Sequence, residues 1–184
     1  MRYVLFLCLG VFSASVSLSA QGDSNPNEAY EYFNEAIGYF KAKDYRKAVV
    51  YYSKAIKVNP EYTKAYYNRG SAKLNVKDYE GAIRDFERAI ELDDAFAKAY
   101  MYKGYTQMRL EDYKQATKSL TKAIALDPTL TKAYLNRGNI QLKFENYELA
   151  IDDFSKVIDL NPTVASAHYN RGVCYQKLKQ MPEA

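Results

Sequence analysis

Histidine, cysteine and tryptophan are scarce in this sequence, which has one, two and none of them respectively. Because His168 is the single histidine, the chain offers neither a Ser-His-Asp catalytic set nor a histidine-rich metal site. It also offers no glycine-rich phosphate loop, since Gly70, Gly104 and Gly138 fall inside expected helices. We therefore expect no enzyme, no cofactor and no metal. His168 is interpreted as a packed aromatic side chain, because Tyr134 stands at the corresponding place earlier in the chain.

A strong excess of one charge is also missing, since 26 basic and 22 acidic residues are interspersed and the net charge is +4. A nucleic-acid partner would require Lys and Arg clustered on one face, so we exclude it. The 19 tyrosines would otherwise suggest base stacking. Eight of them recur at two fixed spacings, which indicates core positions instead. These eight are Tyr32, Tyr66, Tyr100 and Tyr134, and Tyr45, Tyr79, Tyr113 and Tyr147.

The longest apolar run lies at the N-terminus. Arg2 is followed by an apolar stretch over residues 3–12 and by small, serine-rich residues over 13–20. This order is typical of a secretory signal peptide, and we expect residues 1–20 to form one that is cleaved after Ala20. The alternative is an uncleaved membrane anchor, which needs about 20 apolar residues. The four serines in the segment favour cleavage.

Disulfides and glycosylation sites are also lacking. Cleavage would remove Cys8 and leave Cys174 as the only thiol, so no internal disulfide is expected. The one Asn-x-Ser/Thr sequence, Asn161-Pro162-Thr163, is excluded as a glycosylation site by its proline. We therefore expect an exported protein in a bacterial periplasm or cell envelope.

From Ala29 onward the sequence repeats every 34 residues. One alanine returns at the same place in every unit, as Ala48, Ala82, Ala116, Ala150 and Ala184. Such a period indicates stacked units that pack on their neighbours, and stacks of this kind usually bind other molecules. We divide the chain into a polar linker over 21–28, units over 29–62, 63–96, 97–130 and 131–164, and a partial fifth unit over 165–184.

Apolar residues three or four apart predict two helices in each unit. A side-chain oxygen before each second helix should cap its free amides. These caps are Asp44, Asp78, Asp112 and Asn146. A residue before proline is driven out of the helical region, so three second helices should end there. These ends are Asn59, Asp127 and Asn161, whereas the second unit has Asp94 in place of the proline.

One glycine in each later unit is expected in the middle of a first helix, where it costs about 1 kcal/mol against alanine. These glycines are Gly70, Gly104, Gly138 and Gly172. The repetition of this cost indicates that two helices approach too closely there for a side chain.

Arg69 and Arg137 have the appearance of ligand-binding bases, but an acid follows each of them sixteen residues later, at Asp85 and Asp153. We favour an ion pair between the two helices of a unit over a binding role. Loss of Asp85 should then weaken folding and not binding.

The residues at fixed positions resemble those of the tetratricopeptide repeat family. In the third unit they are Tyr100, Gly104, Tyr113, Ala116, Leu120, Ala123 and Pro128. The resemblance covers residues 29–184 and implies an all-α fold of helix-turn-helix units in a right-handed superhelix. The Tyr-x-Asn-Arg-Gly sequences at 66–70 and 134–138 resemble those of bacterial members, and the end of the signal segment resembles exported proteins of the Bacteroidetes.

The sequence ends inside the fifth unit, because residues 181–184 would only begin its second helix. We expect a fragment of a longer array, without a polar terminal helix. The apolar face of the last helix, which includes Val173, Tyr175 and Leu178, should then be poorly covered.

The resemblance further implies that the first helices line a concave groove. Lysines at one inward position of successive units predict a positive stripe, and the alternative is that they are solvated surface. Tyrosines give contact area at low entropy cost, and asparagines can pair with an extended peptide backbone. The predicted groove residues are Lys64, Tyr67, Asn68, Lys98, Met101, Tyr102, Tyr105, Lys132, Asn136, Asn139 and Asn170.

One subclass of the family clamps the terminal carboxylate of heat-shock chaperones. Its pattern requires Lys and Asn where this chain has Phe33 and Ile37, and Arg where it has Tyr102. The clamp is incomplete, so we reject this function.

We predict a non-catalytic scaffold that binds a protein or peptide segment of acidic character in the groove. One alternative is a structural array that self-associates through the incomplete fifth unit. Another is an accessory repeat region of a longer envelope protein. Membrane contact is expected only through the signal segment, if that segment is not cleaved.

Overall fold

The computed structural model describes residues 26–180. The predicted signal segment, residues 21–25 of the predicted linker and residues 181–184 lie outside the described residues. Within 26–180 the chain forms nine α-helices and no strand. The helices are α1 Pro26–Lys41, α2 Tyr45–Val58, α3 Thr63–Asn75, α4 Tyr79–Leu92, α5 Ala97–Arg109, α6 Tyr113–Leu126, α7 Thr131–Lys143, α8 Tyr147–Leu160 and α9 Ala165–Gln180. Because α1 begins at Pro26, the last three residues of the predicted linker belong to the first helix.

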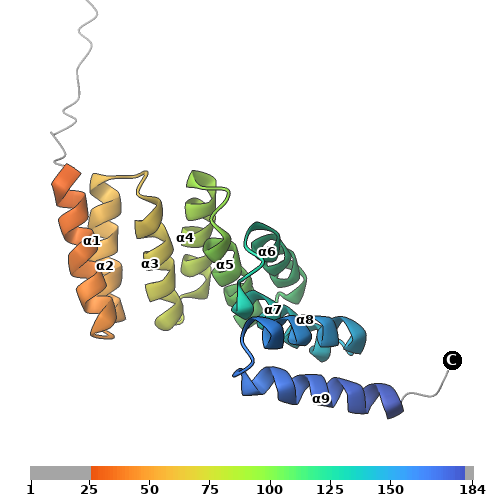
Figure 1. The fold of residues 1–184 in the computed structure, drawn as a ribbon. Helices are drawn as coiled ribbons and strands as arrows, with labels where there is room; N and C mark the ends of the chain where they lie inside the picture. The colour runs from red at the N-terminus through yellow and green to blue at the C-terminus, as the bar shows by residue number, and fades with distance from the viewer. Residues whose placement is uncertain (1–25, 181–184) are drawn as a thin grey trace, which may run out of the picture.

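The helices form hairpins that stack side by side into a right-handed superhelix (Figure 1). Within each hairpin α1 packs on α2, α3 on α4, α5 on α6 and α7 on α8, and the second helix of one hairpin packs on the first helix of the next. The last helix, α9, packs chiefly on α8. The predicted all-α repeat fold is confirmed, and each unit relies on its neighbours for its apolar contacts.

Mid-helix glycines mark the closest approach of the two helices in a hairpin. The nearest atoms to a Cβ built on each glycine belong to Phe86 for Gly70, Leu120 for Gly104 and Phe154 for Gly138, at 2.8, 2.8 and 2.9 Å. Contacts this short leave no room for a side chain unless the neighbour moves. The predicted close approach is therefore confirmed in the second, third and fourth units. A Cβ built on Gly172 of α9, by contrast, meets no described atom within 4 Å outside its own helix backbone.

Three of the four predicted helix caps form. The carboxylates of Asp44, Asp78 and Asp112 each accept a hydrogen bond from the backbone amide three residues later. The prediction for Asn146 is wrong, because this side chain makes no capping bond. Its amide nitrogen donates instead to Oε1 of Gln141 at 2.9 Å, a competing partner at the end of the preceding helix.

The second helices end at residues with extended backbone. Asn59, Asp127 and Asn161 adopt this conformation, as the following proline predicts. Asp93 adopts it without a following proline. Its Oδ1 accepts a hydrogen bond from the backbone amide of Ala95 at 3.1 Å, and the same turn recurs after the other three helices. The side-chain turn thus ends the second unit in place of proline.

The turn inside each hairpin places a non-glycine residue in the left-handed region. These residues are Lys43, Lys77, Glu111 and Glu145, with φ between 60° and 65°. Lys and Glu carry no sequence signal for such a turn, which is usually occupied by Gly or Asn. The turn was therefore not predictable, although it sets the direction in which the second helix leaves the first.

The predicted ion pair joins the two helices of the second and fourth units. Asp85 is 3% exposed and accepts hydrogen bonds from Nε and Nη2 of Arg69 at 2.8 and 2.6 Å. Nζ of Lys73 lies 2.9 Å from the same carboxylate. Asp153 accepts from Nε and Nη2 of Arg137 at 3.0 and 2.7 Å, and this hydrogen bonding raises the pKa of Arg137. These arginines therefore act within the fold.

Fewer tyrosines are buried than expected. Of the eight assigned to the core from their spacing, Tyr134 and Tyr147 are buried and the other six are half-buried. Alanines and single large side chains, such as Phe86 and Phe154, fill the contacts between helices instead. The interior is narrow, so a tyrosine ring at its edge keeps part of its surface in water.

Candidate functional site

Two adjoining cavities open on the first helices of the second, third and fourth units. The larger has a volume of about 570 Å³ and the smaller of about 290 Å³. Met101, Tyr102 and Lys132 line both, so the two form one groove across α3, α5 and α7. The other residues of the larger cavity are Leu74, Asn75, Lys77, Tyr79, Tyr105, Arg109, Leu135 and Asn136. The smaller cavity adds Tyr67, Lys98, Thr129, Leu130 and Thr131.

The charge of this groove is of one sign. Lys77, Lys98, Arg109 and Lys132 are the charged residues that line the two cavities, and none of the lining residues is acidic. The sequence as a whole has nearly as many acids as bases, so this is a local feature. Neither Lys98 nor Lys132 forms a salt bridge with a described residue. The hydrogen bonds from Thr129, followed by the nearby Lys98, lower the pKa of Asp127, so Lys98 does have an acid in its surroundings. The groove therefore presents positive charge that is not held in salt bridges within the described part of the chain.

One wall of the groove is formed by two tyrosines of an aromatic cluster. The rings of Tyr67 and Tyr102 pack edge to face with centroids 5.7 Å apart. Phe96 lies 4.8 Å from Tyr67, and Phe86 stacks on Tyr102 at 6.0 Å. Burial, followed by the proximity of Tyr102, raises the pKa of Tyr67. The hydroxyl of Tyr67 therefore stays protonated and uncharged at neutral pH.

Arg109 lines the larger cavity and contacts two tyrosines. Its Nη1 donates a 3.4 Å hydrogen bond to the hydroxyl of Tyr105. Its guanidinium carbon lies 5.5 Å from the centre of the Tyr79 ring. The hydrogen bond to Tyr105 and the nearby Tyr79 raise the pKa of Arg109, which therefore stays charged. A charged guanidinium at this place can form a bidentate pair with a carboxylate.

Seven of the predicted groove residues line the two cavities. They are Tyr67, Lys98, Met101, Tyr102, Tyr105, Lys132 and Asn136. The four that do not line them are Lys64, Asn68, Asn139 and Asn170. Nδ2 of Asn170 donates to Oδ1 of Asn139 at 2.9 Å, so these two amides pair with each other across α7 and α9. Lys64 is exposed on α3, outside both cavities, so the lysines of the predicted stripe do not share one cavity wall.

Sequence reasoning missed part of the groove. Lys77 and Tyr79 lie in the turn after α3 and at the start of α4, while the family pattern directs attention to the first helices alone. Tyr79 had been assigned to the core by its spacing. Its position beside Arg109 depends on the left-handed turn at Lys77, which the sequence does not signal.

Residues that could perform chemistry are not gathered here. His168 is exposed and its Nε2 lies 2.9 Å from the carbonyl oxygen of Pro162, so the expectation of a packed side chain is wrong. Cys174 is buried, and burial raises the pKa of its thiol. Over residues 26–180 no three side chains of His, Cys, Asp or Glu come together as a metal site. In the same range no helix is long and apolar enough to span a membrane.

Comparison of the sequence with known families gives one result for every complete unit. A model described as tetratricopeptide repeat matches residues 29–62, 63–96 and 131–164, and a second model of the same description matches residues 97–130. A search of curated protein sequences found no match.

Solved structures of similar fold are numerous. MamA from Desulfovibrio magneticus RS-1 has a TM-score of 0.76 at 24% identity, over 87% of this chain and 88% of that one. YrrB, described as a TPR protein with an unusual peptide-binding site, has a TM-score of 0.71 at 26% identity, over 84% and 80%. The first TPR of Spaghetti (RPAP3), bound to the HSP90 peptide SRMEEVD, has a TM-score of 0.64 at 24% identity, over 65% and 95%.

Proposed function

Because the chain belongs to the tetratricopeptide repeat family, we propose that it is a non-catalytic scaffold whose groove binds a peptide segment of acidic character. The observation that carries this proposal is the charge of the two cavities, whose lining includes four basic residues and no acidic one. Cavities of this size are in the range that small ligands and single peptide side chains occupy.

The groove suits a peptide that alternates apolar and acidic side chains. Met101 and Leu135 provide an apolar floor, on which an aliphatic side chain of the peptide would be buried. Lys132 and Arg109 lie at the same cavity and would each face a carboxylate. The amide of Asn136 can both donate to and accept from a peptide backbone. Charge thus sets the preference for acidic ligands, and the apolar floor provides most of the buried area.

Two of the similar structures support a ligand of this class. YrrB carries a peptide-binding site, and the peptide on the first TPR of Spaghetti (RPAP3) contains Glu-Glu and Asp. The present chain would hold its peptide differently, because Phe33, Ile37 and Tyr102 replace the polar residues of the chaperone clamp. Side-chain acids would therefore matter here more than a terminal carboxylate.

We further propose that the protein acts after export, in a bacterial periplasm or envelope. The support for this is the basic, apolar and serine-rich order of residues 1–20. The mass of the protein recovered from an expressing bacterium tests the assignment. A mature N-terminus at Gln21 agrees with it, whereas an intact Met1 would refute cleavage.

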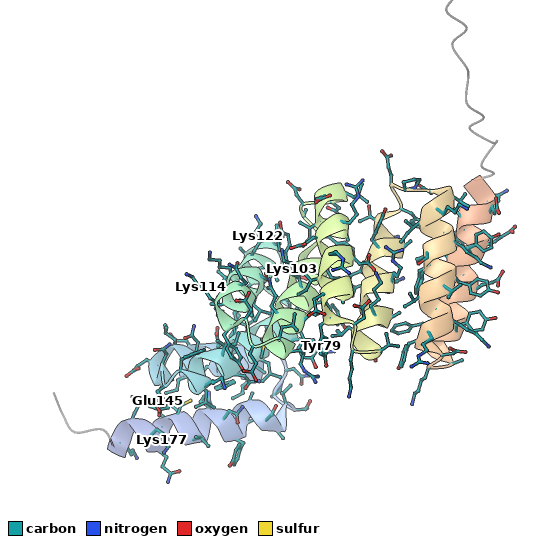
Figure 2. All side chains as sticks on the ribbon, turned by 180° about the vertical axis from the view of Figure 1, so that it is seen from behind. Tyr79, Lys103, Lys114, Lys122, Glu145 and Lys177 are labelled. Carbon is teal, nitrogen blue, oxygen red and sulfur yellow. The ribbon has the colours of Figure 1, made fainter. Side chains whose placement is uncertain are left out.

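A selection from a random peptide library tests the groove proposal. The full chain should enrich peptides rich in Asp and Glu. Lys98→Glu/Lys132→Glu should abolish this enrichment, since it reverses two of the four basic residues of the groove. The control Lys114→Glu/Lys122→Glu makes the same charge change on α6, which contributes no residue to either cavity (Figure 2).

Equal enrichment by the groove variant and the control would refute the groove as the binding site. Lys64→Glu tests whether the ligand contacts all three lysines of the predicted stripe or only Lys98 and Lys132, which line the cavities. It should leave enrichment unchanged if the ligand occupies only the two cavities, because Lys64 lines neither of them.

A further inference from the structure

The four basic residues of the groove form two separate pairs. Lys98 and Lys132 are each the second residue of a first helix, α5 and α7, and both line the smaller cavity. Arg109 is the last residue of α5, Lys77 lies in the turn between α3 and α4, and both line the larger cavity. The ring of Tyr79, two residues after Lys77, lies 5.5 Å from the guanidinium carbon of Arg109. We call the first pair the lysine end of the groove and the second pair the arginine end.

The length of α5 sets the distance between the two ends. Lys98 and Arg109 stand near opposite ends of this helix, and at about 1.5 Å per residue their backbones lie about 16 Å apart along its axis. The side chains of α5 that line the groove between them are uncharged. They are Met101, Tyr102 and Tyr105. The groove thus has two positive ends and an uncharged middle.

The acids nearest in these surroundings are already engaged in turns and caps. Asp127 accepts hydrogen bonds from the backbone amide and the hydroxyl of Thr129 at 3.0 and 2.6 Å. Asp78, the neighbour of Lys77 in the sequence, accepts one from the backbone amide of Gly81 at 3.0 Å. Neither acid lines a cavity. Each end of the groove can therefore receive a carboxylate from a ligand.

The width of the groove favours an extended ligand over a helical one. A volume of about 570 Å³ spread along about 16 Å corresponds to a mean cross-section of about 35 Å². An α-helix, about 10–12 Å in diameter, has more than twice this cross-section. An extended chain advances about 3.3 Å per residue, so the two ends of the groove lie about five residues apart along it.

The alternation of side chains in an extended chain narrows the spacing further. Two side chains point to the same side only when they are an even number of residues apart, so two acids that face the groove are four or six apart. The flexible side chains of Lys77, Lys98 and Lys132 can accommodate either spacing. A side chain midway between the acids would lie over Met101, which is 6% exposed, and Leu135.

We propose that the ligand is an extended segment with two acidic side chains four or six residues apart and an apolar side chain between them. This proposal rests on the groove function proposed above and adds the spacing of the charges to it. One acid lies between the ammonium groups of Lys98 and Lys132. The other forms a bidentate pair with Arg109, beside Lys77.

A titration of the full chain with four peptides, followed by NMR chemical shifts, tests the spacing. The peptides have one composition, with two Glu, one Leu between them and Ala and Gln elsewhere, and their ends are acetylated and amidated. The two Glu are two, four, six or eleven residues apart, and eleven is the spacing that a helical ligand would need. The peptides with spacings of four and six should bind about fivefold more tightly than the other two, because only they place a carboxylate at both ends.

Neutral variants assign each acid to one end of the groove. Lys98→Gln/Lys132→Gln removes the charge of the lysine end, and Lys77→Gln/Arg109→Gln removes that of the arginine end. Each should weaken binding of the tighter peptide about fivefold. When one Glu of that peptide is changed to Gln, its effect should be non-additive with one end variant and additive with the other. The control Lys114→Gln/Lys122→Gln loses the same charge on α6 and should bind as the unaltered chain does.

Several results would overturn the two-ended arrangement. Equal affinity for all four spacings, or an effect of only one end variant, would mean that the acids do not occupy separate ends. Tightest binding at a spacing of eleven would make the ligand a helix. With any of these results, enrichment of acidic peptides from the random library would still support the groove function. If the library shows no preference for acids and none of the four peptides binds, both proposals fail.

Discussion

Asp85 is the residue whose loss should weaken the fold most sharply. Its carboxylate is 3% exposed and holds two cations, Arg69 through two hydrogen bonds and Lys73 at 2.9 Å. The side chains of both cations are 17% exposed. Asp85→Asn would keep the shape of the side chain but leave two half-buried positive charges without a counter-charge. Breaking a buried pair in this way costs about 3–5 kcal/mol.

Asp153 provides the matched comparison, because it holds one cation instead of two. Arg137 is also somewhat more exposed, at 23%. Asp153→Asn should therefore cost less, about 2–3 kcal/mol. Asp152→Asn, at an exposed position next to it, should change stability by less than about 0.5 kcal/mol. The expected order of destabilisation is Asp85, then Asp153, then Asp152.

Urea unfolding followed by circular dichroism measures the three effects, with amide exchange to report local opening of the repeats. Adding Arg69→Gln to Asp85→Asn should recover part of the loss, because one stranded charge is removed. If Asp85→Asn unfolds at the same urea concentration as the unaltered chain, the ion pair does not hold the hairpin together. Arg69 would then return to the list of candidate ligand-binding residues.

Three further changes test the helix contacts, caps and turns. Gly104→Ala should lower the free energy of unfolding by about 1–3 kcal/mol, because its Cβ would lie 2.8 Å from Cγ of Leu120. An unchanged Tm in thermal unfolding would contradict the close approach. Asp112→Ala should lower the free energy of unfolding by about 1 kcal/mol through loss of a helix cap, whereas Asn146→Ala should lower it clearly less. Equal losses of stability in the two variants would show that capping is not the cause. Glu145→Gly should raise the free energy of unfolding by about 0.5–1 kcal/mol, since φ is 60° there, and a loss in urea unfolding would mean that the side chain stabilises the turn.

The fold could be predicted because its determinants recur at one period. The 34-residue spacing of Gly70 and Gly104 predicts the close helix contacts. The sixteen-residue spacing of Arg69 and Asp85 predicts the ion pair. Each of these contacts joins two helices of one hairpin, so it depends only on local geometry. The prediction of a cap at Asn146 was wrong because a side-chain amide, unlike a carboxylate, can donate a hydrogen bond to a neighbouring side chain, here Gln141.

The groove was predictable only where it lies on the first helices of the units. Met101 and Lys132 were found from their positions in the first helices, whereas Lys77 and Tyr79 were missed because a left-handed turn places them. His168 shows a second limit of prediction from repeat positions. Its counterpart Tyr134 is buried, but His168 lies on the last described helix and is exposed. Burial at a repeat position depends on the neighbouring helix as well as on the residue itself.

The place of a bound acidic peptide on the array tests the central claim most directly. A peptide enriched by the selection can be synthesised with a photoreactive group, crosslinked to the full chain and mapped by mass spectrometry. The groove model predicts crosslinks to α5 and α7, at or beside Met101, Tyr102 and Lys132, which line both cavities. Crosslinks confined to α2, α4, α6 or α8 would contradict it, because those second helices contribute at most the edge residue Tyr79 to the groove.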